Sequence, residues 1–230
     1  MYGRKFVSPI WQLAVIVGRH SQTTNRQEMK HIKLTTLIFG LLLFGCNQTN
    51  NKTTSSTDQT SAIVSDDKEK LQQLIRRLYE WHETKSSHND FDPVADNQDI
   101  IYVGLDLKKQ EQRQIELKQT DFFADQFIDN YNKIALTIDN DLKSKKLEWQ
   151  VGNLPPFGND ANPWCNCQDN PDNYWQTMTI NKIELDKNAA TFTWTWGDNF
   201  EYKVYAVKQN NNWKISYLQG FDFNEFIPTK

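Results

Sequence analysis

Residues 191–206 read TFTWTWGDNFEYKVYA, and this stretch decides the fold. Large apolar residues alternate with threonines before the Gly197-Asp198-Asn199 turn, and apolar residues alternate with polar ones after it. A period of two is typical of a strand with one buried face, and a Gly-Asp-Asn composition favours a tight turn. The stretch therefore predicts a β-hairpin with an aromatic inner face, made of Phe192, Trp194, Trp196, Phe200, Tyr202, Val204 and Ala206.

Strands on either side extend this hairpin into an antiparallel meander. After the polar turn 210–212 a third alternating run follows, with Trp213, Ile215 and Tyr217. Upstream, Tyr174 to Leu185 reads as a longer strand whose apolar parity slips between Ile180 and Ile183. A slip of this kind predicts a β-bulge, which bends a sheet.

Helices are predicted before the sheet. An amphipathic helix is predicted over residues 67–84. Asp66 and Glu69 resemble a capping box at its start. Its apolar stripe consists of Leu71, Leu74, Ile75, Leu78 and His82. A second helix runs from a Thr120 cap and places on one face Phe123, Phe127, Tyr131, Ile134 and Ile138. Residues 86–99 are expected to be a loop, and the charged, Gln-rich residues 105–118 a further helix.

Residues 29–45 have the anatomy of a secretory signal: a basic start, an apolar run from Leu34 and a small residue before Cys46. The run is about a dozen residues long, short of the ~20 that span a bilayer as a helix. Its end, Leu43-Phe44-Gly45-Cys46, resembles the lipobox of bacterial lipoproteins. This resemblance implies that Cys46 is acylated and becomes the first residue of the mature chain; the alternative is an ordinary signal peptide with an unmodified Cys46.

The signal divides the chain into segments with different expected roles. Residues 1–28 precede a complete signal with its own methionine, so they are expected to be a mis-annotated upstream extension, unless residues 1–45 are one genuine leader. Residues 46–65 are polar and are expected to be a flexible tether. Residues 66–230 are expected to form a single globular α+β domain, anchored in the cell envelope by the lipid on Cys46, more plausibly at the periplasmic side of the outer membrane than at the inner membrane.

The charge of the mature part argues against nucleic-acid partners. Positions 1–45 hold six basic residues and one acidic residue; removing them from totals of 26 and 29 leaves 20 and 28, a formal charge of −8. A surface this acidic repels phosphate backbones. We therefore expect the partners to be the membrane, through the lipid, and an apolar or amphipathic small molecule or a protein.

Helices followed by a curved antiparallel sheet resemble the cone-shaped, cystatin-like fold of the nuclear-transport-factor-two-like superfamily. The segment Asp160-x-x-Pro163-Trp164-x-x-x-Gln168-Asp169 is similar to a motif of bacterial lipoproteins in domain-of-unknown-function family 3828. The resemblance covers about residues 67–222. It implies a cone-shaped fold and an envelope setting but brings no established activity, since the superfamily mixes isomerases, dehydratases and binding domains.

The motif supplies the candidate pocket residues, which are Asp160, Trp164, Gln168, Asp169 and Trp175. An Asp in an apolar pocket can act as a general acid or base, and a Trp can stack on a ligand. The alternative is structural: Asp and Gln in a Pro-containing loop are often turn formers, and Trp side chains often pack in the core. His82 and Asp169 are the candidate catalytic residues, with His82 equally readable as a core histidine.

Cys165 and Cys167 are the thiols that remain once Cys46 is acylated. They are interpreted as a possible disulfide or as small packed apolar groups, with redox chemistry and metal binding as alternatives. No Ser-His-Asp order, phosphate-binding glycine loop, zinc motif or calcium loop occurs in the sequence, and no cofactor or metal is expected. Three functions stay open: a non-catalytic binding lipoprotein, an immunity or inhibitor lipoprotein against an envelope toxin, and a small isomerase, dehydratase or hydrolase.

Overall fold

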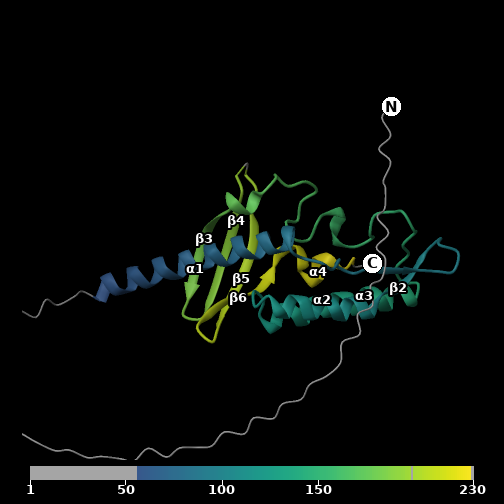
Figure 1. Cartoon of the computed structure of the whole chain (residues 1–230), viewed down its shortest axis with the longest axis horizontal. Coiled ribbons are helices and arrows are strands. Elements are labelled where there is room, and N and C mark those ends of the chain that lie inside the picture. The colour runs from purple at the N-terminus through teal and green to yellow at the C-terminus, as the bar shows by residue number, and fades with distance from the viewer. Residues whose placement is uncertain (1–55, 198, 229–230) are drawn as a thin grey trace, which may run out of the picture. The chain divides into compact units, whose positions relative to one another are not determined.

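The computed structural model describes residues 56–197 and 199–228 (Figure 1). The predicted upstream extension, the signal and the lipidation of Cys46 lie outside these residues. In chain order the elements are α1 (Ser56–Thr84), β1 (Pro93–Ala95), β2 (Tyr102–Leu105), α2 (Leu107–Gln119), α3 (Asp125–Lys143), β3 (Thr179–Asp186), β4 (Ala189–Thr195), β5 (Tyr202–Gln209), β6 (Asn212–Leu218) and α4 (Phe223–Phe226). No helix within the described ranges is both long and apolar enough to cross a membrane.

The main sheet is the predicted antiparallel meander, with strand order β3-β4-β5-β6. On β4, Ala190, Phe192 and Trp194 are buried while the threonines between them are half-buried. Phe192 pairs with Val204 and Trp194 with Tyr202, so the buried side chains of β4 and β5 share one face. The period-two pattern therefore placed the right side chains on the inner face, and the α+β class is confirmed.

The strand register of the main sheet shifts at two places. The register of β3 against β4 shifts between Asn181 and Glu184, which confirms the predicted slip, although β3 begins only at Thr179. A second shift, between Tyr205 and Ala206, was not predicted. Because of it the core position near the end of β6 is Leu218, and Tyr217 instead stacks on Tyr205 with ring centroids 4.5 Å apart.

Helix α1 begins earlier than its sequence suggested. It starts at Ser56, so residues 56–65 are helical rather than the flexible tether expected there, and Asp66 lies inside the helix instead of capping it. Asp66 accepts a hydrogen bond from Lys70 one turn later, at 2.6 Å. The described part of α1 is stabilised further along, where its apolar stripe packs against the sheet.

Thr120 does not cap the second helix as predicted. It is the C-cap of α2, and α3 begins only at Asp125 after Ala124. The intervening backbone is used by the sheet: the Ile215 amide donates to the Phe122 carbonyl and the Ala124 amide to the Ile215 carbonyl, both at 2.8 Å. These bonds cover the edge of β6 and hold the segment out of the helix.

A second, smaller sheet lies in a region predicted as loop and helix start. β1 and β2 pair antiparallel, and the other edge of β2 meets residues 149–151: the Tyr102 amide donates to the Trp149 carbonyl at 2.8 Å. β2 lies against α3 at Gly104, where an added Cβ would come within 2.9 Å of Asp139 Oδ1. We call β1, β2 and residues 149–151 the small sheet.

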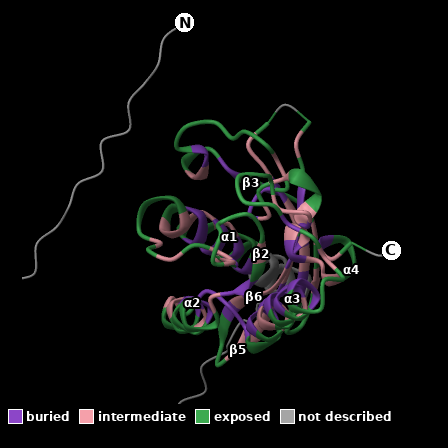
Figure 2. Cartoon of the chain, turned by 90° about the vertical axis from the view of Figure 1, so that its right-hand side faces the viewer, coloured by how far each residue is buried: buried purple, intermediate pink, exposed green. Residues whose placement is uncertain are grey.

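The hydrophobic core lies between the helices and the inner face of the main sheet, as the purple segments of Figure 2 show. α1 contributes Leu71, Ile75, Leu78 and Tyr79, and α3 contributes Phe127, Tyr131, Ile134 and Ile138. The apolar faces predicted for both helices are therefore confirmed, except that Phe123 is buried ahead of α3 and His82 is only half-buried.

Candidate functional site

The structure does not bring the five predicted pocket residues to one cavity. Trp164 is 2% exposed and belongs to the core, while Gln168 and Asp169 are exposed on the loop that follows. Trp175 is half-buried against Tyr174, and Asp160 lines a shallow hollow of about 250 Å³ beside Phe226. The motif is thus split between the core and the surface.

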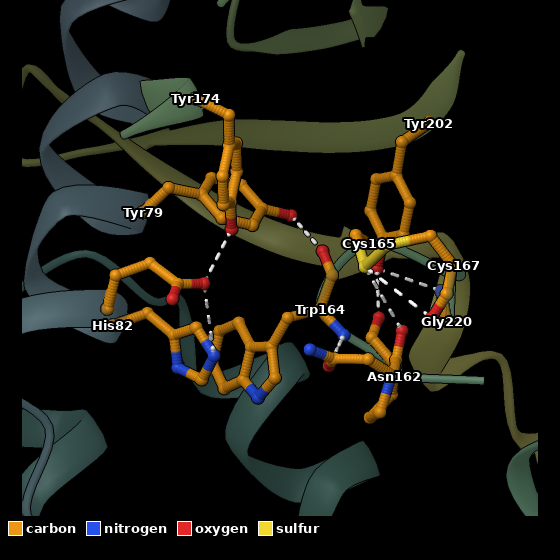
Figure 3. Close-up of a disulfide and its surroundings, with 11 residues drawn as sticks. Tyr79, His82, Asn162, Trp164, Cys165, Cys167, Tyr174, Tyr202 and Gly220 are labelled. Carbon is orange, nitrogen blue, oxygen red and sulfur yellow. Dashed lines mark hydrogen bonds and ion pairs between the residues drawn. A yellow bond between two sulfur atoms is a disulfide. The ribbon is translucent and has the colours of Figure 1, made fainter. Parts of the chain in front are cut away.

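Trp164 fills the space between α1 and the sheet (Figure 3). Its ring stacks on His82 at 4.1 Å and meets Phe221 edge-on at 5.2 Å. Its carbonyl accepts a hydrogen bond from Tyr79, and the preceding carbonyl, that of Pro163, accepts one from Tyr202 at 2.7 Å. The residues of the motif therefore hold the inner face of the sheet against α1, in the place where a cone-shaped pocket was expected.

Cys165 and Cys167 form a disulfide, one of the two structural roles expected of them. Their Cα atoms are 5.1 Å apart, within the usual range, because the chain turns here instead of running as a strand. The Asn162 amide donates to the Cys167 carbonyl at 2.8 Å, and the Asn162 side chain accepts from the Trp164 amide at 3.0 Å. The bridge and these bonds clamp the turn that presents Trp164 (Figure 3).

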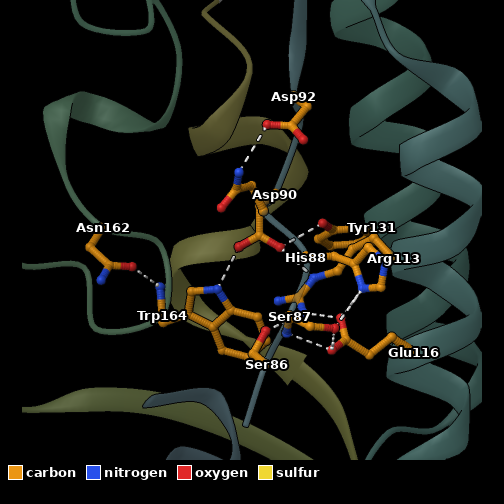
Figure 4. A network of polar contacts seen from close by, with 11 residues as sticks. Ser86, Ser87, His88, Asp90, Asp92, Arg113, Glu116, Tyr131, Asn162 and Trp164 are labelled. Carbon is orange, nitrogen blue, oxygen red and sulfur yellow. Dashed lines mark hydrogen bonds and ion pairs between the residues drawn. The ribbon is translucent and has the colours of Figure 1, made fainter. Parts of the chain in front are cut away.

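A buried polar network anchors the other side of Trp164 (Figure 4). The Asp90 carboxylate accepts from the Trp164 indole at 2.6 Å, from Tyr131 at 2.6 Å and from Arg113 at 2.9 Å. Arg113 is 1% exposed and also donates to Glu116 at 2.8 Å. Because every charge in this network has a partner of opposite sign, it can be buried without an orphan ion.

The candidate catalytic residues occupy different settings. His82 is packed on Trp164, and burial lowers its pKa against the opposing influence of Asp90. Its Nδ1 atom is buried and has no hydrogen-bond partner among the residues described. Asp169 lies exposed on the loop after the disulfide. The two groups are not joined by any hydrogen bond within the described chain, so the structure does not bring the two candidates together in one site.

The Glu116 carboxylate makes the stability of the network depend on pH. Burial opposes its ionisation, but hydrogen bonds from Ser87 and Arg113 outweigh burial and lower its pKa to about 2. A carboxyl group whose pKa is depressed on folding stabilises the fold above its unfolded pKa, and this contribution is lost as the pH falls through its folded pKa. We expect the free energy of unfolding, measured with urea, to decline from about pH 5 to about pH 2.

Glu116→Gln should flatten that decline, whereas Glu111→Gln, an exposed change on the same helix, should leave it as in the wild type. Equal slopes for all three proteins would contradict the assignment of this pH dependence to Glu116.

A recess with apolar and aromatic lining lies between β2 and the end of α3. It has a volume of about 350 Å³ and is lined by Ile101, Tyr102, Val103, Leu142, Lys143, Lys145, Leu147, Glu148, Trp149 and Gln150. Tyr102 and Trp149 pack together at its base, with ring centroids 4.3 Å apart. We call it the β2–α3 pocket; Figure 1 shows β2 beside the end of α3.

Exposed apolar side chains gather around this pocket. Of the nine large hydrophobic residues that are exposed in the described ranges, six belong to the small sheet or its flanks: Val94, Ile100, Ile101, Val103, Val151 and Leu154. Leu154 is the extreme case at 73% exposure. Scattered apolar residues are ordinary on a protein surface, but two of these six, Ile101 and Val103, line the recess itself, which makes it a candidate interaction site. We call these six residues the apolar cluster.

The pocket was not predicted because no element was assigned from the sequence to residues 100–104 or 142–150, whereas the helix predicted over 105–118 is confirmed as α2. The signal was present: residues 100–103 read IIYV, a short β-branched and aromatic run typical of a strand. At four residues the run is too short to show a period, so its burial and its partner strands could not be inferred.

No group of three or more His, Cys, Asp or Glu side chains suited to a metal ion occurs in the part of the chain that the structure describes. Comparisons of the chain with protein-family models, with curated proteins and with solved structures find no match in any of the three.

Proposed function

We propose that this chain is a cell-envelope lipoprotein with a non-catalytic binding domain, and that its ligand site is the β2–α3 pocket. The lipid on Cys46 holds the domain at a membrane, and a small molecule with apolar surface enters between β2 and the end of α3. We also propose that the domain is related to the cone-shaped superfamily. Its ligand pocket, however, lies at a different place from the one expected from that resemblance.

The apolar cluster is the observation that carries the proposal. A volume of about 350 Å³ lies within the range of small-molecule sites, roughly 300–1,000 Å³. The pocket combines an aromatic base, Tyr102 and Trp149, with aliphatic walls from Leu142 and Leu147. Exposing such surface to water is unfavourable by about 25 cal/mol per Å², so covering it with an apolar ligand supplies binding energy.

Binding is tested with N-phenyl-1-naphthylamine, a neutral apolar dye that fluoresces when it leaves water. Ile101→Asp puts a charge on the pocket wall, and we expect it to weaken dye binding by about tenfold, since it removes roughly 1.4 kcal/mol of apolar contact. The matched control is Ile115→Asp on α2, because Ile115 is exposed to a similar degree, 48% against 37%, and does not line the pocket.

The dye titration has a clear negative result. If the wild type and Ile101→Asp take up the dye equally, the dye lies elsewhere, for instance on the apolar run before Cys46, and the proposed site is wrong.

The lipid anchor is tested separately. Cys46→Ser removes the thiol that would carry the acyl chains, and we expect the protein to move from the membrane fraction to the soluble fraction of cells and to lose incorporation of labelled palmitate. Because stable anchoring needs more than one acyl chain and the acyl chains are all carried by Cys46, the variant should leave the membrane fraction almost completely. A Cys46→Ser protein that stays in the membrane fraction would show that another segment holds it there.

A further inference from the structure

We infer that the β2–α3 pocket binds a single-chain amphiphile with an anionic head group, such as a medium-chain carboxylate. The chain lies on Tyr102, Leu147 and Trp149, and the carboxylate meets the ammonium group of Lys145 at the rim. This inference rests on the proposed function and adds the chemical class of the ligand.

Two lysines, Lys143 and Lys145, stand among the lining residues of the pocket in an otherwise acidic domain. The side chain of Lys143 is 57% exposed, whereas its partner Asp139 is 9% exposed behind it. Lys146, the residue after Lys145, is likewise 56% exposed, and its partner Asp141 is 10% exposed. In both pairs the carboxylate is buried and the ammonium group is exposed, so the ammonium group is the member that an approaching ligand can reach. Glu148 is the one carboxylate among the lining residues, against two lysines.

Lys145 is the cation best placed for a ligand. It forms no ion pair with any residue in the described ranges, whereas Lys143 is held by Asp139 at 2.7 Å. It follows the end of α3 with a φ of +59°, and its amide donates to the Leu142 carbonyl. Glycine is the favoured residue at such a helix end, because a side chain is strained there.

The shape of the site favours a free amphiphile over a bilayer. A recess between a strand and a helix end can enclose one chain, whereas a bilayer contact needs apolar side chains on a protruding face with cations around them. Lys145 lines the same pocket as Tyr102 and Trp149, so one ligand can place its carboxylate on Lys145 and its chain on the two aromatic rings.

Calorimetry with two amphiphiles of equal chain length tests the class of ligand. Decanoate should bind the wild-type protein at least about fivefold more tightly than decyltrimethylammonium, the effect of one favourable charge pair near a surface. Equal affinities would overturn the anionic head group and leave the proposed pocket intact. Binding of neither amphiphile, together with no uptake of the neutral dye, would overturn the pocket itself. Sedimentation with phosphatidylglycerol vesicles by a Cys46→Ser protein that ignores decanoate would overturn the free amphiphile in favour of a bilayer.

Lys145→Gly separates a loss of binding from a loss of folding. It removes the charge and relieves the strain, so we expect a higher midpoint of urea unfolding and about fivefold weaker decanoate binding. Lys187→Gly is the matched control, since Lys187 is another lysine at positive φ and does not line the pocket. It should raise the midpoint and leave decanoate binding as it is. Unchanged decanoate affinity in Lys145→Gly overturns the inference.

Discussion

Gly220→Ala should destabilise the protein severely, by at least about 3 kcal/mol, the upper part of the range for overpacked cores. An added Cβ at Gly220 would lie 2.0 Å from the carbonyl oxygen of Pro163 and 2.6 Å from its carbonyl carbon. These are backbone atoms, so no side chain can turn aside to make room. The same oxygen accepts the hydrogen bond from Tyr202, and the Gly220 amide donates to that hydroxyl at 2.9 Å.

Urea unfolding followed by far-UV circular dichroism measures this effect. Gly152→Ala is the control, because Gly152 has a φ of +88° but no atom within 4 Å of the added Cβ, and its cost should be only the roughly 1–2 kcal/mol of backbone strain. If Gly220→Ala costs no more than Gly152→Ala, the loop of Pro163 and Trp164 is not packed on the sheet as described.

Trp164→Ala should cost about 3–5 kcal/mol, as do other truncations of large buried aromatic residues. The change empties the space between His82 and Phe221 and removes the indole that donates to Asp90. Trp164→Phe keeps most of the ring and loses only the donor, so it should cost less, about 1–3 kcal/mol for a buried acceptor left short of a partner.

Trp175→Ala provides the comparison for Trp164, because Trp175 belongs to the same predicted pocket set but is only half-buried. It should cost clearly less than Trp164→Ala in the same urea titration. A small effect for Trp164→Ala, joined to a gain or loss of ligand binding, would mean that this side chain serves a pocket after all.

The meander could be predicted from the sequence because a period of two is a local property that survives in the fold. Phe192, Trp194 and Tyr202 lie where the alternation puts them. Tyr217 does not, because the bulge between Tyr205 and Ala206 depends on the pairing of two strands and leaves no mark in either one alone. Thr120 was misread for a similar reason: a threonine before an apolar run fits a helix start, but the edge of β6 claims the residues between Thr120 and Asp125.

The candidate pocket was harder to predict than the fold. The motif around Trp164 shows which residue types stand together, but it does not show whether the loop faces a cavity or fills one. Its buried partners, Asp90 and Arg113, come from a loop and a charged helix that carried no recognisable pattern. For the proposed function, this means that the ligand site lies away from the motif around Trp164. Because Trp164 occupies the inner face of the sheet, we place the proposed ligand site at the β2–α3 pocket.

Two-dimensional ¹⁵N NMR of the purified protein during a decanoate titration tests the proposed binding site most directly. We expect saturable shifts of the amide signals of the residues that line the pocket, which are 101–103, 142, 143, 145 and 147–150. Shifts concentrated instead at residues 163–165 and on β4 and β5, or no saturable shifts at all, would contradict it.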